Sequence, residues 1–303
     1  MRLKKKLTNQ EIPRIKNILW RFFKNSFKKG YPDNPGTPQE FDYRKKLTTK
    51  EEKIIYEAKK KMPNLQKILK EAYESIQNEE LRIFQSEYIK THFSECVVKL
   101  EQKAFSIYLK YEERLFLSII EKWISENEDF LIKLNKKCSD FKEFTKEICR
   151  NFYPVVQRME FESSQTRKAR GGKSFEYIIE CLLKAINIPC EKPRGREPRR
   201  ILKRVDLVIP DQSTAINRPD QAFFLSCKRT LRERWKQAIP ERKPSWRVFL
   251  LTIDENLPED KANEIDALGM IVYVKDELKN QTHLKDKSWV RKLSDLPKDI
   301  LGK

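Results

Sequence analysis

An aspartate and a lysine stand in two successive apolar runs of the sequence. Asp206 lies inside RVDLVIP (Arg204–Pro210), and Lys228 ends QAFFLSCK (Gln221–Lys228). A carboxylate in an apolar run is costly to bury unless it meets a cation or a proton donor. If the two runs are strands of a hairpin joined by residues 211–220, both side chains reach one site. The alternative for Asp206 is a strand-end ion pair with no chemical role.

An aspartate and a lysine with a further acid nearby are what metal-assisted phosphodiester hydrolysis needs. Carboxylates hold a hard cation such as Mg²⁺, which polarises the scissile phosphate and activates water. The lysine ammonium stabilises developing negative charge or orients the attacking water. Asp206 and Lys228 therefore predict a site for this chemistry.

A second group of chemically apt residues follows the lysine, at Arg232, Glu233 and Arg234. Arginine donates two hydrogen bonds to O6 and N7 of guanine, and glutamate accepts one from N4 of cytosine. The triplet therefore predicts recognition of adjacent G·C pairs in a major groove. The alternative is a salt-bridged surface helix.

The order VDLVIP then FFLSCK resembles the core of the PD-(D/E)XK nuclease superfamily, with Asp206 and Lys228 at its acid and lysine. Val205 replaces the motif's proline, and Ser226 replaces the acid two residues before the lysine. One branch of type II restriction endonucleases, which recognises a CCGG core or its interrupted form and includes EcoRII, PspGI, SsoII and NgoMIV, moves that acid to the following helix. It also places base-recognising residues just after the lysine. Here Glu241 stands 13 residues after Lys228 and the Arg-Glu-Arg triplet begins four after it, offsets similar to those of the SsoII and PspGI members.

The resemblance implies a restriction-endonuclease-like α/β (α+β) fold, with a central mixed β-sheet flanked by helices and an all-helical N-terminal region before it. It implies that Asp206 and Glu241 bind Mg²⁺ and that Lys228 assists the attacking water. Glu176, in RKARGGKSFEYIIE, would complete the acidic cluster, with Glu180 one turn later as the alternative.

Two basic segments predict contacts to the DNA backbone or to outer bases. The density of basic residues in them suits tracking a phosphate backbone, and the alternative is a solvated charge run. The candidates are Arg167, Lys168, Arg170 and Lys173 in the first segment, and Arg199 and Arg200 in RGREPRRILKR (Arg194–Arg204).

Composition supports a nucleic-acid partner. The 303 residues include 64 Lys+Arg and 45 Asp+Glu, a net charge of +19 that attracts polyanions at long range. Six scattered cysteines and two histidines do not favour a disulfide framework or a zinc site. No apolar run suits a membrane span or a signal peptide, so we expect no membrane association and a cytoplasmic protein, in a prokaryotic cell if the resemblance holds.

Hydrophobic periodicity divides the chain into a helical region, residues 1–158, and a mixed α/β domain, residues 159–303. The resemblance implies that the second is the catalytic domain and that the first contacts DNA or forms the dimer. In the first region we expect helices at Asn9–Lys29, Thr48–Lys61, Asn64–Ser75 and Glu79–Cys149, the last with a break near Ser125–Asn127. In the second, a basic, glycine-containing loop should lead into a helix at Ser174–Ile186 that Ser174 caps. The expected strands are Arg204–Pro210, Gln221–Lys228, Arg247–Ile253 and Gly269–Val274, with helices at Arg229–Ala238 and Glu259–Leu268.

The resulting hypothesis is a homodimeric type II restriction endonuclease that cuts double-stranded DNA at CCGG, CCNGG or CCWGG and leaves 5′ overhangs. A two-fold symmetric site calls for a two-fold symmetric protein, and the family implies a partner DNA methyltransferase. Some relatives stack an extruded base on an aromatic side chain, for which Tyr111, Phe116 and Trp123 are candidates. The alternatives are a non-specific repair or recombination nuclease of the same superfamily, a catalytically inactive DNA-binding protein, and an RNA-binding helical protein.

Overall fold

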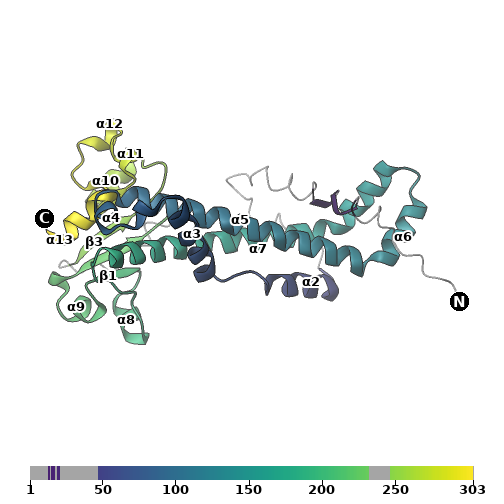
Figure 1. Ribbon diagram of the computed structural model, residues 1–303, viewed down its shortest axis with the longest axis horizontal. Coiled ribbons are helices and arrows are strands. Elements are labelled where there is room, and N and C mark those ends of the chain that lie inside the picture. Colours follow the sequence, from purple (N-terminus) through teal and green to yellow (C-terminus); the bar gives the residue numbers. More distant parts are fainter. Residues whose placement is uncertain (1–12, 14, 18, 21–46, 232–245, 303) are drawn as a thin grey trace. The chain divides into compact units, whose positions relative to one another are not determined.

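The computed structural model describes residues 13, 15–17, 19–20, 47–231 and 246–302. The chain divides into two compact units (Figure 1): unit 1 comprises Met1–Asn64 and Tyr108–Arg167, and unit 2 comprises Leu65–Ile107 and Lys168–Lys303. Two long helices, α5 (Phe93–Glu126) and α7 (Phe141–Ala185), contribute residues to both units. The boundary predicted between residues 158 and 159 lies inside α7, so the two units group the chain differently from that prediction.

Unit 1 is helical in its described residues, as expected for this part of the chain. Besides its parts of α5 and α7 it contains α2 (Thr49–Lys59) and α6 (Glu128–Lys137). Thr48 and Glu51 form a capping box at the start of α2, which confirms the predicted start of that helix. The core consists of buried apolar residues of these helices together with Ile15 and Leu19. Both residues belong to the predicted helix Asn9–Lys29, most of which lies outside the described residues.

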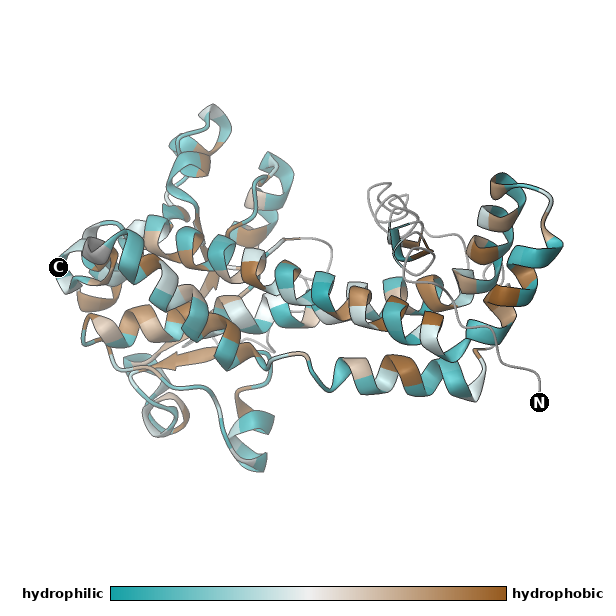
Figure 2. Cartoon of the chain, turned by 45° about the vertical axis from the view of Figure 1, so that its right-hand side comes forward, coloured by the Kyte–Doolittle hydropathy of each residue, from teal (hydrophilic) through white to brown (hydrophobic). Residues whose placement is uncertain are grey.

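Unit 2 is built on a sheet of five strands, counted over the residues that the structure describes. The strand order is β1-β2-β3-β4-β5, with β1 antiparallel to β2 and the remaining pairs parallel. The strands are β1 (Leu207–Ile209), β2 (Phe223–Cys227), β3 (Arg247–Leu251), β4 (Ile271–Val274) and β5 (Val290–Lys292). The mixed sheet predicted from the sequence is thus confirmed. β1, β2 and β4 consist mainly of apolar residues, whereas Figure 2 shows that most helices carry both apolar and polar residues.

Both faces of the sheet are covered. Alternate residues such as Val208, Phe224 and Leu250 form one core with apolar residues of the helices α10, α11 and α12. The residues between them, such as Leu207 and Leu225, are buried as well. The remaining elements of unit 2 are α3 (Leu65–Glu79), η2 (Leu81–Phe84), α4 (Ser86–Thr91), α8 (Arg196–Ile201), α9 (Gln212–Asn217), η3 (Pro219–Gln221), α10 (Glu259–Ala267), α11 (Asp276–Lys279), α12 (Thr282–Lys285), η5 (Leu293–Asp295) and α13 (Leu296–Leu301).

The loop predicted before Ser174 is wrong, because α7 continues through it. Gly171 and Gly172 lie inside this helix, and Ser174 is a buried helical residue rather than a cap. A glycine in a helix costs about 0.5–1 kcal/mol relative to alanine. Burial of large apolar side chains of the same helix, among them Phe175 and Ile179, outweighs this cost at about 1.5–3 kcal/mol each.

Several other predicted bounds need correction. The break near Ser125–Asn127 is confirmed at Asn127, but the stretch before it is divided into η2, α4 and α5. Arg229 to Leu231 are not helical, so the helix predicted from Arg229 does not begin there, and residues 232–238 lie outside the described part. None of the helices formed by the described residues combines the length and apolarity needed to cross a membrane.

Candidate active site

Asp206 and Lys228 meet at the end of the hairpin formed by β1 and β2. The Lys228 Nζ donates a hydrogen bond to Asp206 Oδ2 at 2.8 Å, and the backbone N–H of Cys227 donates to the same oxygen at 2.7 Å. Both side chains are partly accessible, with 18% of Asp206 and 27% of Lys228 exposed. The pair is therefore held by the protein and still open to a ligand.

The backbone fixes this geometry. β1 begins at Leu207, so Asp206 precedes the strand by one residue instead of lying inside it as predicted. Its N–H nevertheless donates to Leu225 O at 2.9 Å, which continues the antiparallel ladder. The N–H of Lys228 donates to Leu251 O at 2.8 Å, on the neighbouring strand β3. Both residues therefore stand at ends of paired strands, where the ladder sets their positions.

Cys227 shows that Glu176 lies in the same environment. Burial raises the pKa of the Cys227 thiol well above its usual range, and the carboxylates of Asp206 and Glu176 raise that pKa further. Glu176 projects from α7 and accepts a hydrogen bond from Lys192 Nζ at 3.0 Å. The ammonium groups of Lys228 and Lys192 act in the opposite direction and lower the pKa of this buried thiol.

The alternative acid, Glu180, is differently placed. It is buried and accepts from Lys184 Nζ, one turn further along α7, at 2.6 Å. Glu176, by contrast, is among the charges with the largest influence on the pKa of the Cys227 thiol, which it raises. Glu180 is thus paired within its own helix, whereas Glu176 pairs with Lys192.

The predicted second metal ligand and the predicted base-recognising triplet cannot be located. Glu241, Arg232, Glu233 and Arg234 lie outside the described residues. Within the described part of the chain, no three His, Cys, Asp or Glu side chains are grouped as ligands for a metal ion.

The predicted backbone-contacting residues differ in their surroundings. Arg167 Nε donates to both carboxylate oxygens of Glu112 at 3.0 Å, and the Glu112 side chain is only 4% exposed. The other residues of the prediction lie on α7 and α8 and are exposed except for the half-buried Arg170; they are Lys168, Arg170, Lys173, Arg199 and Arg200. Arg167 is therefore engaged inside unit 1, while most of the others offer their charge to solvent.

Sequence patterns missed the ion pair between Arg229 and Glu101. Arg229 Nε donates to Glu101 Oε1 at 2.6 Å and its Nη2 donates to Oε2 at 3.2 Å, although the two residues are 128 positions apart. The Glu101 side chain is 5% exposed, so this is a largely buried carboxylate. The one signal for this pair in the sequence was the position of Glu101 on the buried side of an amphipathic helix.

Two of the three proposed stacking residues belong to the core of unit 1. Phe116 and Trp123 are 3% and 2% exposed, and the Trp123 ring packs edge-to-face on Phe152 at 5.0 Å. Stacking on an extruded base would require both to leave the core, so this prediction is wrong for them. Tyr111 is half-buried and remains a candidate.

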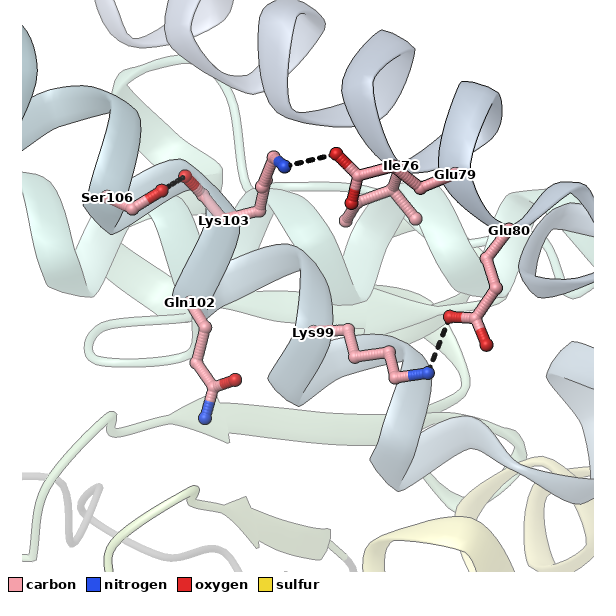
Figure 3. A pocket seen from close by; sticks show the side chains of 7 residues that line it. All are labelled: Ile76, Glu79, Glu80, Lys99, Gln102, Lys103 and Ser106. Atoms are coloured by element: carbon pink, nitrogen blue, oxygen red, sulfur yellow. Dashed lines mark hydrogen bonds and ion pairs between the residues drawn. The ribbon is translucent and has the colours of Figure 1, made fainter.

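A cavity of about 360 Å³ lies between α3 and α5, and none of the predicted site residues lines it (Figure 3). Lys99 Nζ donates to Glu80 and Lys103 Nζ to Glu79, each at 2.6 Å. Because glutamates neutralise its lysines, the cavity lacks the positive charge that a phosphate backbone requires. It does not extend the candidate site.

Comparison with known families decides the relationship. Residues 137–296, just over half of the chain, match the family described as EcoRII C terminal. The chain belongs to the EcoRII C-terminal family. The matched range of this family contains every predicted catalytic, metal-binding and DNA-contacting residue from Arg167 to Glu241.

Individual relatives agree with the family. The type II restriction enzyme SsoII of Shigella sonnei is 27% identical over 203 residues, and the match covers 64% of each chain. The chain thus spans about 64% of the length of this curated relative. A structure of metal-depleted Ecl18kI in complex with uncleaved DNA superposes with a TM-score of 0.69 at 20% identity, over 84% of this chain and 83% of that one. The restriction endonuclease PspGI in a complex with substrate DNA superposes with a TM-score of 0.58 at 22% identity, over 81% and 94%. Unit 2 thus belongs to a restriction-endonuclease fold, as predicted.

Proposed function

We propose that this chain is a type II restriction endonuclease that hydrolyses duplex DNA at a CC/GG-type site, which is CCGG, CCNGG or CCWGG. The contact between Asp206 and Lys228 at adjacent strand ends, in a chain of the EcoRII C-terminal family, carries the proposal. The name of SsoII and the DNA in the Ecl18kI and PspGI complexes support DNA as the substrate.

Mg²⁺ is the proposed cofactor, with Asp206 and Glu241 as ligands and Glu176 beside them. The carboxylates of Asp206 and Glu176 fit this cation, since both are partly exposed and Mg²⁺ prefers oxygen ligands. When bound, the cation would polarise the scissile phosphate and favour ionisation of the attacking water.

Lys228 has the geometry of a group that orients water or a phosphate oxygen. Its ammonium has three N–H donors, and Asp206 accepts one of them. The donors that face solvent are available to a phosphate oxygen or to the attacking water, while Asp206 keeps the ammonium at the ends of β1 and β2. A positive charge held there stabilises the charge that develops as the phosphodiester bond breaks.

Base recognition is assigned to Arg232, Glu233 and Arg234, because arginine can donate to O6 and N7 of guanine and glutamate can accept from N4 of cytosine. The exposed basic residues of α7 and α8 would neutralise backbone phosphates and set the register on the duplex. These are Lys168, Lys173, Arg199 and Arg200, with Arg170 beside them.

The proposed target also defines the partners. A two-fold symmetric site is cut in both strands when two copies of the chain bind it as a homodimer. The products would carry 5′ overhangs and 5′-phosphates. A DNA methyltransferase that modifies the same site would protect the DNA of the prokaryotic cytoplasm in which the enzyme acts.

Two variants and a matched control test the proposal. Asp206→Asn and Lys228→Ala should abolish Mg²⁺-dependent cleavage of plasmid DNA while binding of a duplex in Ca²⁺ persists. Asp220→Asn, an exposed acid between the same two strands, should cleave normally. Cleavage that survives in both site variants would show that the site is wrongly assigned. Binding without any cleavage by the unaltered protein would favour an inactive DNA-binding protein, and unspecific degradation would favour a repair or recombination nuclease.

A further inference from the structure

Three residues, Arg229 to Leu231, separate Lys228 from the proposed base-recognising triplet. Leu231 is 1% exposed and belongs to the core on one face of the sheet. Its N–H donates to Asp254 Oδ2 at 2.7 Å, and its carbonyl accepts from Lys261 Nζ at 2.8 Å. A carboxylate and an ammonium group thus hold both backbone polar groups of one buried residue.

The other end of this short segment is held as firmly. The bidentate pair with the buried Glu101 fixes the guanidinium of Arg229, which also lies 5.7 Å from the centre of the Phe105 ring. The carbonyl of Arg229 accepts from Thr252 Oγ1 at 3.4 Å. The Arg229 side chain also passes Gly171 of α7, where a Cβ would lie 3.4 Å from Arg229 Cδ.

These contacts are directional, which apolar packing is not. Hydrogen bonds to charged groups contribute about 1.5–3 kcal/mol each and restrict both distance and angle. Their donors and acceptors come from α5, from the loop after β3 and from α10. Consecutive Cα atoms are about 3.8 Å apart, so holding Leu231 also fixes the point from which residues 232–234 start.

We propose that Asp254 and Lys261, together with the pair of Arg229 and Glu101, are positioning residues that set the register between hydrolysis and base recognition. One end of the segment follows Lys228, the proposed partner of the scissile phosphate, and the other precedes Arg232, the first residue of the proposed base-recognising triplet. This inference rests on the proposed endonuclease function. It assigns sequence discrimination partly to residues that touch no DNA.

The test compares Asp254→Ala with Asp254→Asn and with the control Glu255→Ala. Alanine leaves the buried Leu231 N–H without an acceptor, whereas the asparagine carbonyl still accepts from it. Glu255 carries the same charge next along the chain, is exposed, and pairs with Lys275 instead of the segment. The site is first determined by plasmid digestion. The ratio of kcat/KM is then measured between a 30-base-pair duplex with that site and one with a single G·C pair replaced by A·T.

We expect Asp254→Ala to narrow this ratio by about tenfold or more, the lower end of the discrimination that one base contact supplies. Asp254→Asn should recover most of the ratio, and Glu255→Ala should keep all of it. Lys261→Met, which retains most of the apolar stem but loses the donor to Leu231 O, carries the same test if Asp254→Ala is unfolded at the assay temperature.

Two results would overturn the inference. A folded Asp254→Ala or Lys261→Met variant with an unchanged ratio shows that these contacts support only the fold. An Asp254→Asn variant as impaired as Asp254→Ala shows that the hydrogen bond to Leu231 is not the cause. If the unaltered protein cuts at a defined site and either result is found, the positioning role alone fails. If it cuts at no defined site, the proposed function fails as well.

Discussion

Alanine substitutions at the paired glycines of α7 test the continuity of this helix. The structure places Gly171 and Gly172 in the interior of a helix, whereas their sequence context is typical of a loop. A glycine-to-alanine change in a helix raises the free energy of unfolding by about 0.5–1 kcal/mol, because the unfolded glycine has more backbone freedom to lose.

The surroundings make the two positions differ. A Cβ at Gly172 meets no atom within 4 Å, so Gly172→Ala should give the full gain of about 0.5–1 kcal/mol. A Cβ at Gly171 would lie 3.4 Å from Arg229 Cδ, at the short limit of ordinary contact. Because Glu101 holds the Arg229 guanidinium, that side chain yields less easily, and Gly171→Ala should gain less than Gly172→Ala.

The assay is equilibrium urea denaturation followed by circular dichroism, with the difference in midpoints multiplied by the common slope. Gly172→Pro is the opposite control, since proline in a helix interior costs about 3 kcal/mol or more. A neutral or destabilising Gly172→Ala together with a tolerated Gly172→Pro would refute the continuous helix and restore the predicted loop.

Three further predictions concern separate features. Arg167→Ala should lower the free energy of unfolding by about 2–4 kcal/mol, because it leaves the buried Glu112 carboxylate with the Tyr108 hydroxyl but without its cation, while 34% exposure of the arginine moderates the loss. Lys168→Ala should instead leave the free energy of unfolding unchanged and reduce the slope of the logarithm of the DNA-binding constant against the logarithm of salt concentration by about 0.9. Equal salt slopes for the Arg167 and Lys168 variants would contradict the assignment of Lys168, but not Arg167, to a phosphate contact. Burial raises the pKa of the Cys96 thiol to about 12, so above pH ~8.5 the unfolded state loses a proton that the folded state keeps. This one thiol therefore lowers the free energy of unfolding by up to about 1.4 kcal/mol for each further pH unit. Cys96→Ala should remove that part of the pH dependence, and an unchanged pH dependence in the variant would show that the thiol ionises normally. Arg232→Ala should cost about 1–3 kcal/mol of discrimination at one G·C position, whereas uniform weakening on all sequences would mark a phosphate contact.

Local periodicity predicted much of the fold. The helical periodicity of Thr48–Lys61 and the apolar runs that became β1 to β4 are short-range signals, and the structure has elements at each of them. β5 was missed because Val290–Lys292 is short and carries two charges among its three residues. Gly171 and Gly172 led to the wrong prediction of a loop for the opposite reason. Their local preference for a loop is strong, but burial of apolar residues further along α7 outweighs it.

In the candidate site, too, short-range contacts were predictable from the sequence and long-range contacts were not. The meeting of Asp206 and Lys228 was predictable because a hairpin brings its own ends together, and the structure has them in contact. The pair of Arg229 and Glu101 was not, since helical periodicity can place Glu101 on a buried face but does not link it to a residue 128 positions away. Glu241 and the Arg-Glu-Arg triplet lie outside the described residues, and their proposed roles come from the sequence.

Digestion of a plasmid of known sequence with Mg²⁺, followed by sequencing of the fragment ends, tests the central claim most directly. The proposed function predicts discrete fragments whose ends all lie at one CC/GG-type sequence, with 5′ overhangs and 5′-phosphates, and no cleavage when the metal is chelated. A smear of random ends, or intact plasmid under conditions where the protein binds it, would contradict the account.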